Sequence, residues 1–209
     1  MAEGFFDIAR TSSVRAAQEA NGVAQHWDSV QGMHEFTRFT GRETEFIAAR
    51  DHFYMATVSE TGWPYVQHRG GPPGFLRVLD DKTLAFADFR GNRQYLSVGN
   101  LGADPRASLI LVDYPNRRRL KMFVHVEIKN LDADPSLAAR LELPGYKAVP
   151  ERAMVLHLEA FDWNCPQHIT PRFTLPEVEA AMTPVRAQIE ELIAENRALR
   201  DKLAAPAVG

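Results

Sequence analysis

The chain has 209 residues, 45% of them apolar and 24% charged, which is typical of one packed domain with an appendage and excludes wholesale disorder. Its single cysteine excludes a disulfide framework and any multi-cysteine metal site, and its formal charge of −3 argues against nucleic acid as the main partner. No run approaches the roughly 20 consecutive apolar residues of a membrane-spanning helix, so we expect no membrane association.

Residues 1–40 are predicted to form an N-terminal arm. Ser12 to Ala20 predicts a short helix within it, whereas Asn21 to Thr40 contains several aromatic residues without a clean period, so we expect that stretch to pack on another element. Met1 to Arg10 lacks the basic flank and apolar core of a secretory signal, which predicts a cytoplasmic protein.

A helix is predicted to open the next domain, residues 41–173. Thr40 and Glu43 have the spacing of a capping box, in which the threonine caps the helix and the glutamate reaches back to it. The helix is expected to extend to about Arg50 and to turn Phe46 and Ile47 toward the core.

Short apolar runs separated by turn residues dominate the rest of this domain. A short helix over residues 92–98, closed by Gly99, interrupts them. Strands recurring at this spacing favour a β-barrel over alternating strands and helices. The predicted strands are 53–58, 64–69, 75–79, 83–88, 107–113, 120–129 and 155–161.

The C-terminal extension, residues 174–209, has a helical pattern. Thr183 and Pro184 predict the N-cap and first residue of a helix over about 184–204. Along it, the seam positions of a coiled coil fall on Val185, Ile189, Leu192, Asn196, Leu199 and Leu203. An asparagine at one core position, and Glu195 five residues before Arg200, favour a parallel pair of helices. The alternative is an amphipathic helix lying on its own barrel.

Several chemistries have no local signature in this sequence. It contains no glycine-rich dinucleotide or nucleotide-triphosphate loop and no nucleophile elbow. Its seven histidines are scattered without metal-ligand spacing, so no metal site is expected. Any catalytic activity must therefore depend on a bound cofactor or on residues that are distant in the sequence.

Basic and polar residues cluster at predicted strand ends. One cluster runs from Gln67 to Gly71, and a second, from Asp88 to Arg93, leads into the predicted short helix. Glycine allows close backbone approach, arginine offers a forked donor, and a helix N-terminus offers free N–H groups, so the second cluster predicts a phosphate seat. A surface turn with exposed arginines is the alternative. A third cluster, residues 117–121, places Arg119 and Lys121 on one side of a strand.

A polar loop, Asp162 to His168, follows the last predicted strand. It contains indole, amide, thiol and imidazole groups within seven residues, and this density is more typical of a site than of a spacer. Cys165 lies inside it, and the sequence leaves open whether this thiol is buried and inert or faces a ligand.

The ordered motifs between residues 40 and 170 resemble the pyridoxamine 5′-phosphate oxidase-like family of FMN-binding split barrels. The motifs are Ala56-Thr-Val, Gly62-x-Pro64-Tyr, Gln67 to Gly71, Leu84 to Asp88, Gly91-Asn-Arg93, Asn100, and Asp104-Pro-Arg106-Ala-Ser-Leu. The closing Trp163 to His168 segment is similar to an uncharacterised bacterial branch of flavin-nucleotide-binding proteins. The resemblance implies a mainly β (α+β) fold, a six-stranded Greek-key split β-barrel with flanking helices, and a homodimer with FMN at the subunit interface.

The resemblance also implies the residues that contact FMN. Gln94 stands where the family has a lysine, and Lys121 is the expected substitute. From the chemistry of the polar loop, His168 is expected to transfer a proton, and a purely structural histidine is the alternative. The expected cofactor-binding residues are Gln67, His68, Arg69, Ala87, Asp88, Asn92, Arg93, Lys121, Trp163 and Gln167.

One departure from the family bears on the reaction. The Arg-x-His-x-Arg segment that holds pyridoxal phosphate in the true oxidase is absent from this sequence. We therefore expect an FMN-dependent oxidoreductase acting on another small molecule. The alternatives are a non-catalytic flavin-binding or redox-sensing module, and a split barrel that binds haem or a deazaflavin.

Overall fold

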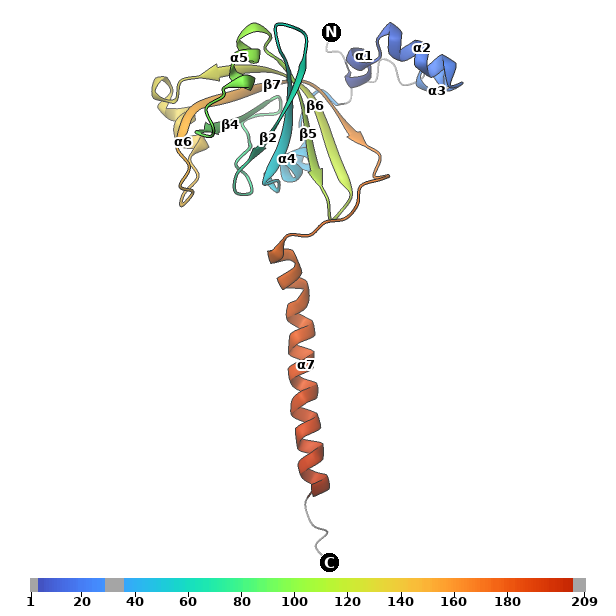
Figure 1. Cartoon of the computed structure of the whole chain (residues 1–209), viewed down its shortest axis with the longest axis vertical. Coiled ribbons are helices and arrows are strands. Elements are labelled where there is room, and N and C mark those ends of the chain that lie inside the picture. Colours follow the sequence, from blue (N-terminus) through green and yellow to red (C-terminus); the bar gives the residue numbers. More distant parts are fainter. Residues whose placement is uncertain (1–3, 29–35, 205–209) are drawn as a thin grey trace, which may run out of the picture. The chain divides into compact units, whose positions relative to one another are not determined.

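The computed structural model describes residues 4–28 and 36–204, and its main feature is one antiparallel sheet (Figure 1). The strands are β1 (His52–Val58), β2 (Pro64–Gly70), β3 (Arg77–Val78), β4 (Thr83–Phe89), β5 (Arg106–Asp113), β6 (Arg118–Lys129) and β7 (Pro150–Asn164). This confirms a mainly β domain with flanking helices. The six strands that the family resemblance implies are one too few, because the two-residue β3, which lies inside the predicted run 75–79, pairs with β4 as an edge strand of its own.

The strands form where apolar residues alternate with polar ones. In β6, for example, Leu120, Met122, Val124 and Val126 are buried while the residues between them are at least partly exposed. β7 extends beyond the predicted 155–161 at both ends because its two neighbours are staggered along it. Residues 150–157 pair with β4, and residues 153–164 pair with β6. Pairing, in addition to apolar pattern, therefore sets the length of this strand.

The sheet curls until its two ends approach one another. The strand order is β2-β1-β5-β6-β7-β4-β3, so β2 and β4 are far apart along the ladder. Even so, Arg69 of β2 lies 2.6 Å from Asp88 of β4, and the rings of Phe53 and Phe86 meet at 5.3 Å inside the core. Among the described strands no ladder joins β2 to β3, so the curled sheet is a barrel with an open seam.

Helix α4 (Gly41–Ala48) begins with the predicted capping box. The backbone N–H of Thr40 donates to Oε2 of Glu43 at 3.0 Å, and the Thr40 hydroxyl donates to the same oxygen at 2.5 Å. Phe46 and Ile47 are buried in the main core, as predicted, although the helix ends two residues before Arg50. Glu43 is itself buried and accepts a further hydrogen bond from the indole of Trp163 at 2.8 Å.

We expect Thr40→Ala to lower the free energy of unfolding by about 1 kcal/mol at neutral pH, the usual effect of losing a threonine N-cap. Burial raises the pKa of Glu43, but hydrogen bonds from Thr40 and Trp163 outweigh it and hold the pKa below its ordinary value. A lowered pKa contributes stability that disappears as the pH falls through it, so the loss on substitution should shrink in acid. Urea titrations at neutral and acidic pH measure this. An equal loss at both would contradict it.

Residues 4–28 of the N-terminal arm contain three short helices: α1 (Phe5–Ala9), α2 (Ser12–Ala20) and α3 (Ala24–Asp28). The bounds of α2 agree with the prediction, whereas α1 and α3 are additional. Phe5 of α1 stacks on Phe123 of β6 with ring centroids 4.5 Å apart, which fastens the first helix to the sheet. Residues 29–35, which belong to the predicted packing segment, lie outside the described residues.

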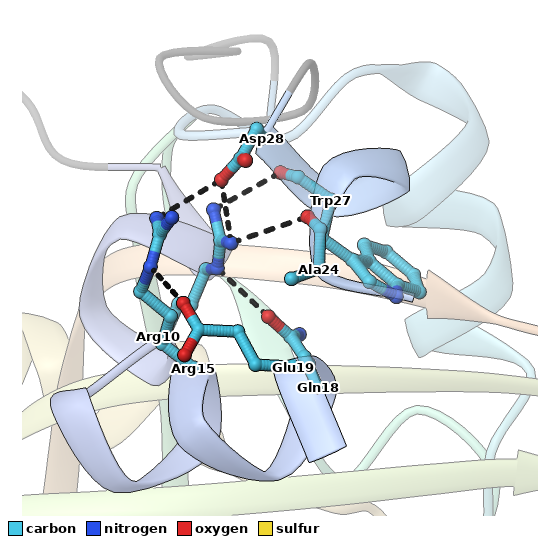
Figure 2. A network of polar contacts seen from close by, with 7 residues as sticks. All are labelled: Arg10, Arg15, Gln18, Glu19, Ala24, Trp27 and Asp28. Atoms are coloured by element: carbon cyan, nitrogen blue, oxygen red, sulfur yellow. Dashed lines mark hydrogen bonds and ion pairs between the residues drawn. The ribbon is translucent and has the colours of Figure 1, made fainter. Parts of the chain in front are cut away.

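Arg10 holds the three helices together (Figure 2). Its side chain is 5% exposed, and its guanidinium donates to the Gln18 side chain at 2.9 Å, to the Trp27 and Ala24 carbonyls, and to Asp28 at 2.7 Å. The hydrogen bond from Arg10 lowers the pKa of Asp28. One buried cation thus satisfies acceptors from two helices that are too short to be stable alone.

Helix α5 (Leu96–Ala103) begins four residues later than predicted and continues through Gly99, so the predicted helix over 92–98 is wrong at both ends. Arg93 and Tyr95 adopt left-handed backbone angles, with φ of 61° and 54°, which excludes them from a right-handed helix. The 3₁₀ helix η1 (Leu131–Ala133) and α6 (Pro135–Leu141) follow β6 and were not predicted.

Helix α7 (Leu175–Ala204) belongs to a second unit, formed by Tyr114–Asn116 and Thr170–Gly209. It begins nine residues before the predicted start, because Thr174 and Glu177 form a capping box: the Thr174 N–H donates to the Glu177 carboxylate at 2.7 Å. Pro184 therefore lies inside the helix instead of at its start. Within the described residues, no helix has both the length and the hydropathy needed to cross a membrane.

Candidate functional site

A cavity of about 220 Å³ lies where β2, the end of β4 and the first turn of α5 meet. The start of β7 completes its wall. It is lined by Tyr65, Gln67, Arg69, Asp88, Phe89, Gly91, Asn92, Arg93, Gln94, Tyr95, Leu96, Ser97, Val98 and Glu151. The two sequence clusters predicted at strand ends therefore meet in one place because the sheet curls.

Three alternating residues of β2 face this cavity. Tyr65, Gln67 and Arg69 share one side of the strand, and the Tyr65 hydroxyl donates a hydrogen bond to the Gln67 side chain. Arg69 Nη1 donates to Asp88 Oδ1 at 2.6 Å, which fixes the guanidinium at the cavity wall.

Asp88 is a buried carboxyl, 5% exposed, between two arginines. Arg69 contacts one of its oxygens at 2.6 Å, and Arg152 Nε lies 3.6 Å from the other. Burial raises the pKa of Asp88 above its ordinary value, and the two arginines oppose this rise without cancelling it. The carboxylate therefore depends on its cationic neighbours to remain ionised.

Glu151 is the second carboxylate of the cavity, and its negative charge is also balanced by neighbouring arginines. Arg90 Nε donates to it at 3.0 Å, Arg152 Nη2 at 2.8 Å, and the Tyr95 hydroxyl at 3.3 Å. The hydrogen bond from Arg90 is the main reason that the pKa of Glu151 is lowered. The Arg152 guanidinium also lies over the Tyr95 ring, 4.9 Å from its centroid.

The loop before α5 is held in an uncommon conformation. Left-handed angles at Arg93 and Tyr95 cost roughly 1–2 kcal/mol each for residues with a Cβ. Asn92 Oδ1 accepts from the Gln94 N–H at 3.1 Å, and Tyr95 is anchored through Glu151. These contacts hold the loop so that Asn92 and Arg93 line the cavity.

Two polar atoms of the cavity wall lack a partner within the part of the chain that the structure describes. They are Nε of Arg69 and Oγ of Ser97, and both are shielded from water. Ser97 is 3% exposed and occupies the first turn of α5, whose leading N–H groups have no partner inside the helix. Buried donors without partners are costly. Nε of Arg77 and Nε of Arg119 are also buried without a partner among the described residues and do not line this cavity, so the two atoms indicate a ligand acceptor only in combination with the charge around the cavity.

The charge around the cavity favours an anion. Arg69, Arg90, Arg93 and Arg152 supply four guanidinium groups, and Asp88 and Glu151 supply two carboxylates, which leaves two positive charges in this cluster. A phosphate monoester carries about −1.5 to −2 at neutral pH. The cluster therefore matches a phosphate group in charge, and its arginines and helix N-terminus match it in donor type.

Five of the predicted cofactor-binding residues line this cavity together: Gln67, Arg69, Asp88, Asn92 and Arg93. Two others lie close in sequence but elsewhere in space. His68 points to the opposite side of β2, where its ring stacks on His52 at 5.6 Å. Ala87 is buried in a second apolar cluster beneath α6.

Lys121 and Trp163 also lie outside the cavity. Lys121 Nζ is paired with Asp162 at 2.9 Å and lies 4.7 Å from the centroid of the Phe5 ring. Trp163 donates to Glu43, and the guanidinium groups of Arg42 and Arg118 lie 4.5 and 4.9 Å from its ring centroid. These contacts connect the end of β7 to α4.

The loop after β7 places Gln167 and His168 in solvent, outside the cavity. His168 adopts a left-handed φ of 62°. Cys165 is exposed as well, so the interpretation of a buried, inert thiol is wrong. Among the described residues, no group of three or more His, Cys, Asp or Glu side chains could hold a metal ion.

The lining residues that were not predicted to be site residues include Tyr65, Tyr95, Ser97 and Glu151. The period of two along β2 relates Tyr65 to Gln67 and Arg69, so this residue could have been found. Ser97 carried no local signal, because the predicted start of the helix lay too early in the chain.

Comparison with known families decides the relationship of this chain. The family model for pyridoxamine 5′-phosphate oxidase matches residues 39–143, which is half of the 209 residues. This chain belongs to the pyridoxamine 5′-phosphate oxidase family. The match confirms the resemblance inferred from the ordered motifs, and it spans β1 to β6, α4 to α6 and most of the cavity wall.

Solved structures similar to this family member include three with low sequence identity. A putative pyridoxamine 5′-phosphate oxidase from Lactobacillus delbrueckii is 18% identical, with 61% of this chain and 96% of that one covered and a TM-score of 0.47. HupZ from Group A Streptococcus is 16% identical, with coverage of 65% and 100% and a TM-score of 0.46. An FMN-binding protein from Syntrophomonas wolfei is 16% identical, with coverage of 70% and 97% and a TM-score of 0.41. No curated protein matches the chain.

Proposed function

We propose that this protein binds FMN and seats its phosphate in the cavity between β2, β4 and α5. The observation that carries the proposal is a cavity that combines an excess of arginine side chains with the N-terminus of α5, and in whose wall Arg69 Nε and Ser97 Oγ are buried without a partner in the described parts of the chain. Arg93 and Asn92 would add donors from the loop, and the N–H groups of the first turn of α5 would complete the set.

A second subunit is part of this proposal. The cavity volume of about 220 Å³ is below the roughly 300–1,000 Å³ of pockets that enclose a whole ligand, so it accommodates the phosphate end of the nucleotide and not all of it. The remainder needs another surface. We place that surface on a second copy of the chain, in a homodimer with FMN at the interface, as the family resemblance implies.

The proposed activity is an FMN-dependent oxidoreduction of a small molecule. FMN supplies hydride or electron transfer when bound, and the protein supplies binding, orientation and electrostatics. Arg69, held by Asp88, would orient the phosphate end and so fix the position of the nucleotide. His168 remains the proposed residue for proton transfer; because it lies outside the cavity, it would act on the substrate side.

The test is a titration of the purified full chain with FMN and with riboflavin, which lacks the phosphate, followed by flavin absorbance and fluorescence. FMN should bind at least about tenfold more tightly, because charge-assisted hydrogen bonds to phosphate contribute roughly 1.5–3 kcal/mol. Equal affinities would contradict the phosphate seat. If the protein binds neither flavin but binds haem or a deazaflavin, the result would favour one of those ligands instead. Reduction by NADH or NADPH, with and without candidate substrates, then separates an enzyme from a non-catalytic flavin-binding module.

A further inference from the structure

The seam of α7 is longer than the sequence alone indicated. The Thr174–Glu177 capping box sets the start of the helix at Leu175. This adds three core positions before the predicted seam, at Leu175, Val178 and Met182. The spacing of four and three then continues without interruption through the whole helix. The a positions are Leu175, Met182, Ile189, Asn196 and Leu203, and the d positions are Val178, Val185, Leu192 and Leu199.

The apolar side chains of this seam are exposed. Their exposed fractions range from 40% for Met182 to 86% for Leu203. Eight apolar side chains on one stripe of a helix form the kind of contiguous surface that marks an interaction site. The a and d side chains follow the 3.5-residue period of a coiled-coil seam, and Ile193 at a neighbouring e position, which is 63% exposed, widens the stripe on one side.

We infer that α7 pairs with α7 of a second copy of this chain as a parallel, in-register, two-stranded coiled coil. Asn196 decides the orientation. In a parallel pair it faces Asn196 of the second copy, and the two side-chain amides can hydrogen-bond to each other. In an antiparallel pair each a residue faces a d residue, and every d residue here is Val or Leu, so the amide would be buried without a partner.

The residues that flank the seam agree with this orientation. Glu195 occupies a g position and Arg200 the e position five residues later, which is the spacing of an ion pair between parallel helices. Pro184 occupies a c position on the outer side, away from the seam. The hydrogen bond that it cannot donate would go to the carbonyl of Ala180, an f residue, so the defect does not touch the packed face.

Disulfide trapping of the full-length protein tests this pairing. Replacing Cys165 with serine removes the single native thiol, and one cysteine is then introduced as Val185→Cys in the seam or as Ala187→Cys on the outer face. In the parallel register two Val185 positions face each other within disulfide reach, whereas two Ala187 positions point apart. Under mild oxidation the seam variant should become a covalent dimer at least about tenfold faster than the outer one.

Equal rates for the two variants, or no disulfide at Val185→Cys, would overturn the parallel pairing. Light scattering of the full-length chain should give twice the chain mass of 23.5 kDa, and a mass of one or three chains would also overturn the inference. Flavin titration of the same variants keeps the two proposals apart. Failure of the helix pairing would leave flavin binding intact, and failure of flavin binding would leave the disulfide intact.

Discussion

Replacing Arg69 with alanine is expected to lower the free energy of unfolding by about 3 kcal/mol at neutral pH. The reason is that Asp88, which is 5% exposed, loses the guanidinium at 2.6 Å and becomes an incompletely compensated buried charge. We take the lower end of the range for broken buried ion pairs because Arg152 remains 3.6 Å from the other carboxylate oxygen.

The loss should depend on pH in a defined direction. Burial raises the pKa of Asp88, so the folded chain retains this proton to a higher pH than the unfolded chain, and stability falls as the pH rises through the folded pKa. The charge of Arg69 lowers that pKa, and removing it moves the pKa higher still. The loss of unfolding free energy caused by Arg69→Ala should therefore be largest at neutral pH. It should be small in acid, where Asp88 is protonated in the folded and in the unfolded chain.

Denaturant titrations across this pH range measure the effect. Adding Asp88→Asn to Arg69→Ala should restore part of the loss at neutral pH, because the amide has no charge to compensate. Arg38→Ala is the matched control, since Arg38 pairs with Asp81 on the exposed surface and should cost less than about 1 kcal/mol. A loss at Arg69 that is no larger than at Arg38, or that is independent of pH, would rule out this account of Asp88.

Arg93→Ala is expected to weaken FMN binding by about 1.5–3 kcal/mol, or roughly tenfold to a hundredfold in Kd. Arg93 lines the cavity from a strained loop, and its guanidinium would donate to the phosphate. Isothermal titration or flavin fluorescence measures the change. Riboflavin affinity should be nearly unchanged by the same substitution, because riboflavin offers no phosphate to this residue.

Arg106→Ala provides the charge-matched control for this experiment. Arg106 is exposed, pairs with Asp104 at 2.6 Å and does not line the cavity, so its removal changes the net charge equally without touching the site. Similar losses of FMN affinity in both variants would indicate a general charge effect. Equal losses for FMN and riboflavin at Arg93→Ala would place Arg93 away from the phosphate.

Most of the sheet could be predicted because its strands are short, alternate in polarity and end at turn residues. The hairpins formed by β1 with β2 and by β5 with β6 lie within a residue or two of their predicted bounds. The start of α5 could not be predicted, because the sequence from 92 to 95 is compatible with a helix. Arg93 and Tyr95 adopt left-handed angles, and Tyr95 is held there by contacts with Glu151 and Arg152, which are distant in the sequence.

The start of α7 was misplaced because two helix-start signals compete. Thr183-Pro184 has the pattern of a cap, but Thr174 and Glu177 have it as well, with a proline in the first turn between them. The Thr183 hydroxyl instead donates to the carbonyl of Glu179 at 3.0 Å, which is a helix-interior bond. Local pattern alone does not choose between two caps in one continuous amphipathic segment.

The sequence could predict which residues belong to the candidate site better than it could predict that they lie together. The residues of its two main clusters were identified from arginine, glycine and amide side chains at strand ends, yet their meeting depends on how far the sheet curls. His68 shows the limit of reading a cluster as a unit, because neighbouring residues in a strand face opposite sides. Ser97 shows the converse, since a lone serine becomes informative only when its hydroxyl is buried without a partner.

The double pairing of β7 has a consequence for how the site can be lost. Residues 153–157 of this strand pair with β4 on one edge and with β6 on the other, so this segment cannot leave the sheet without breaking both ladders. Glu151 and Arg152 precede this stretch directly. Local opening of this wall of the cavity should therefore cost more free energy than opening of a segment that is paired on one edge only.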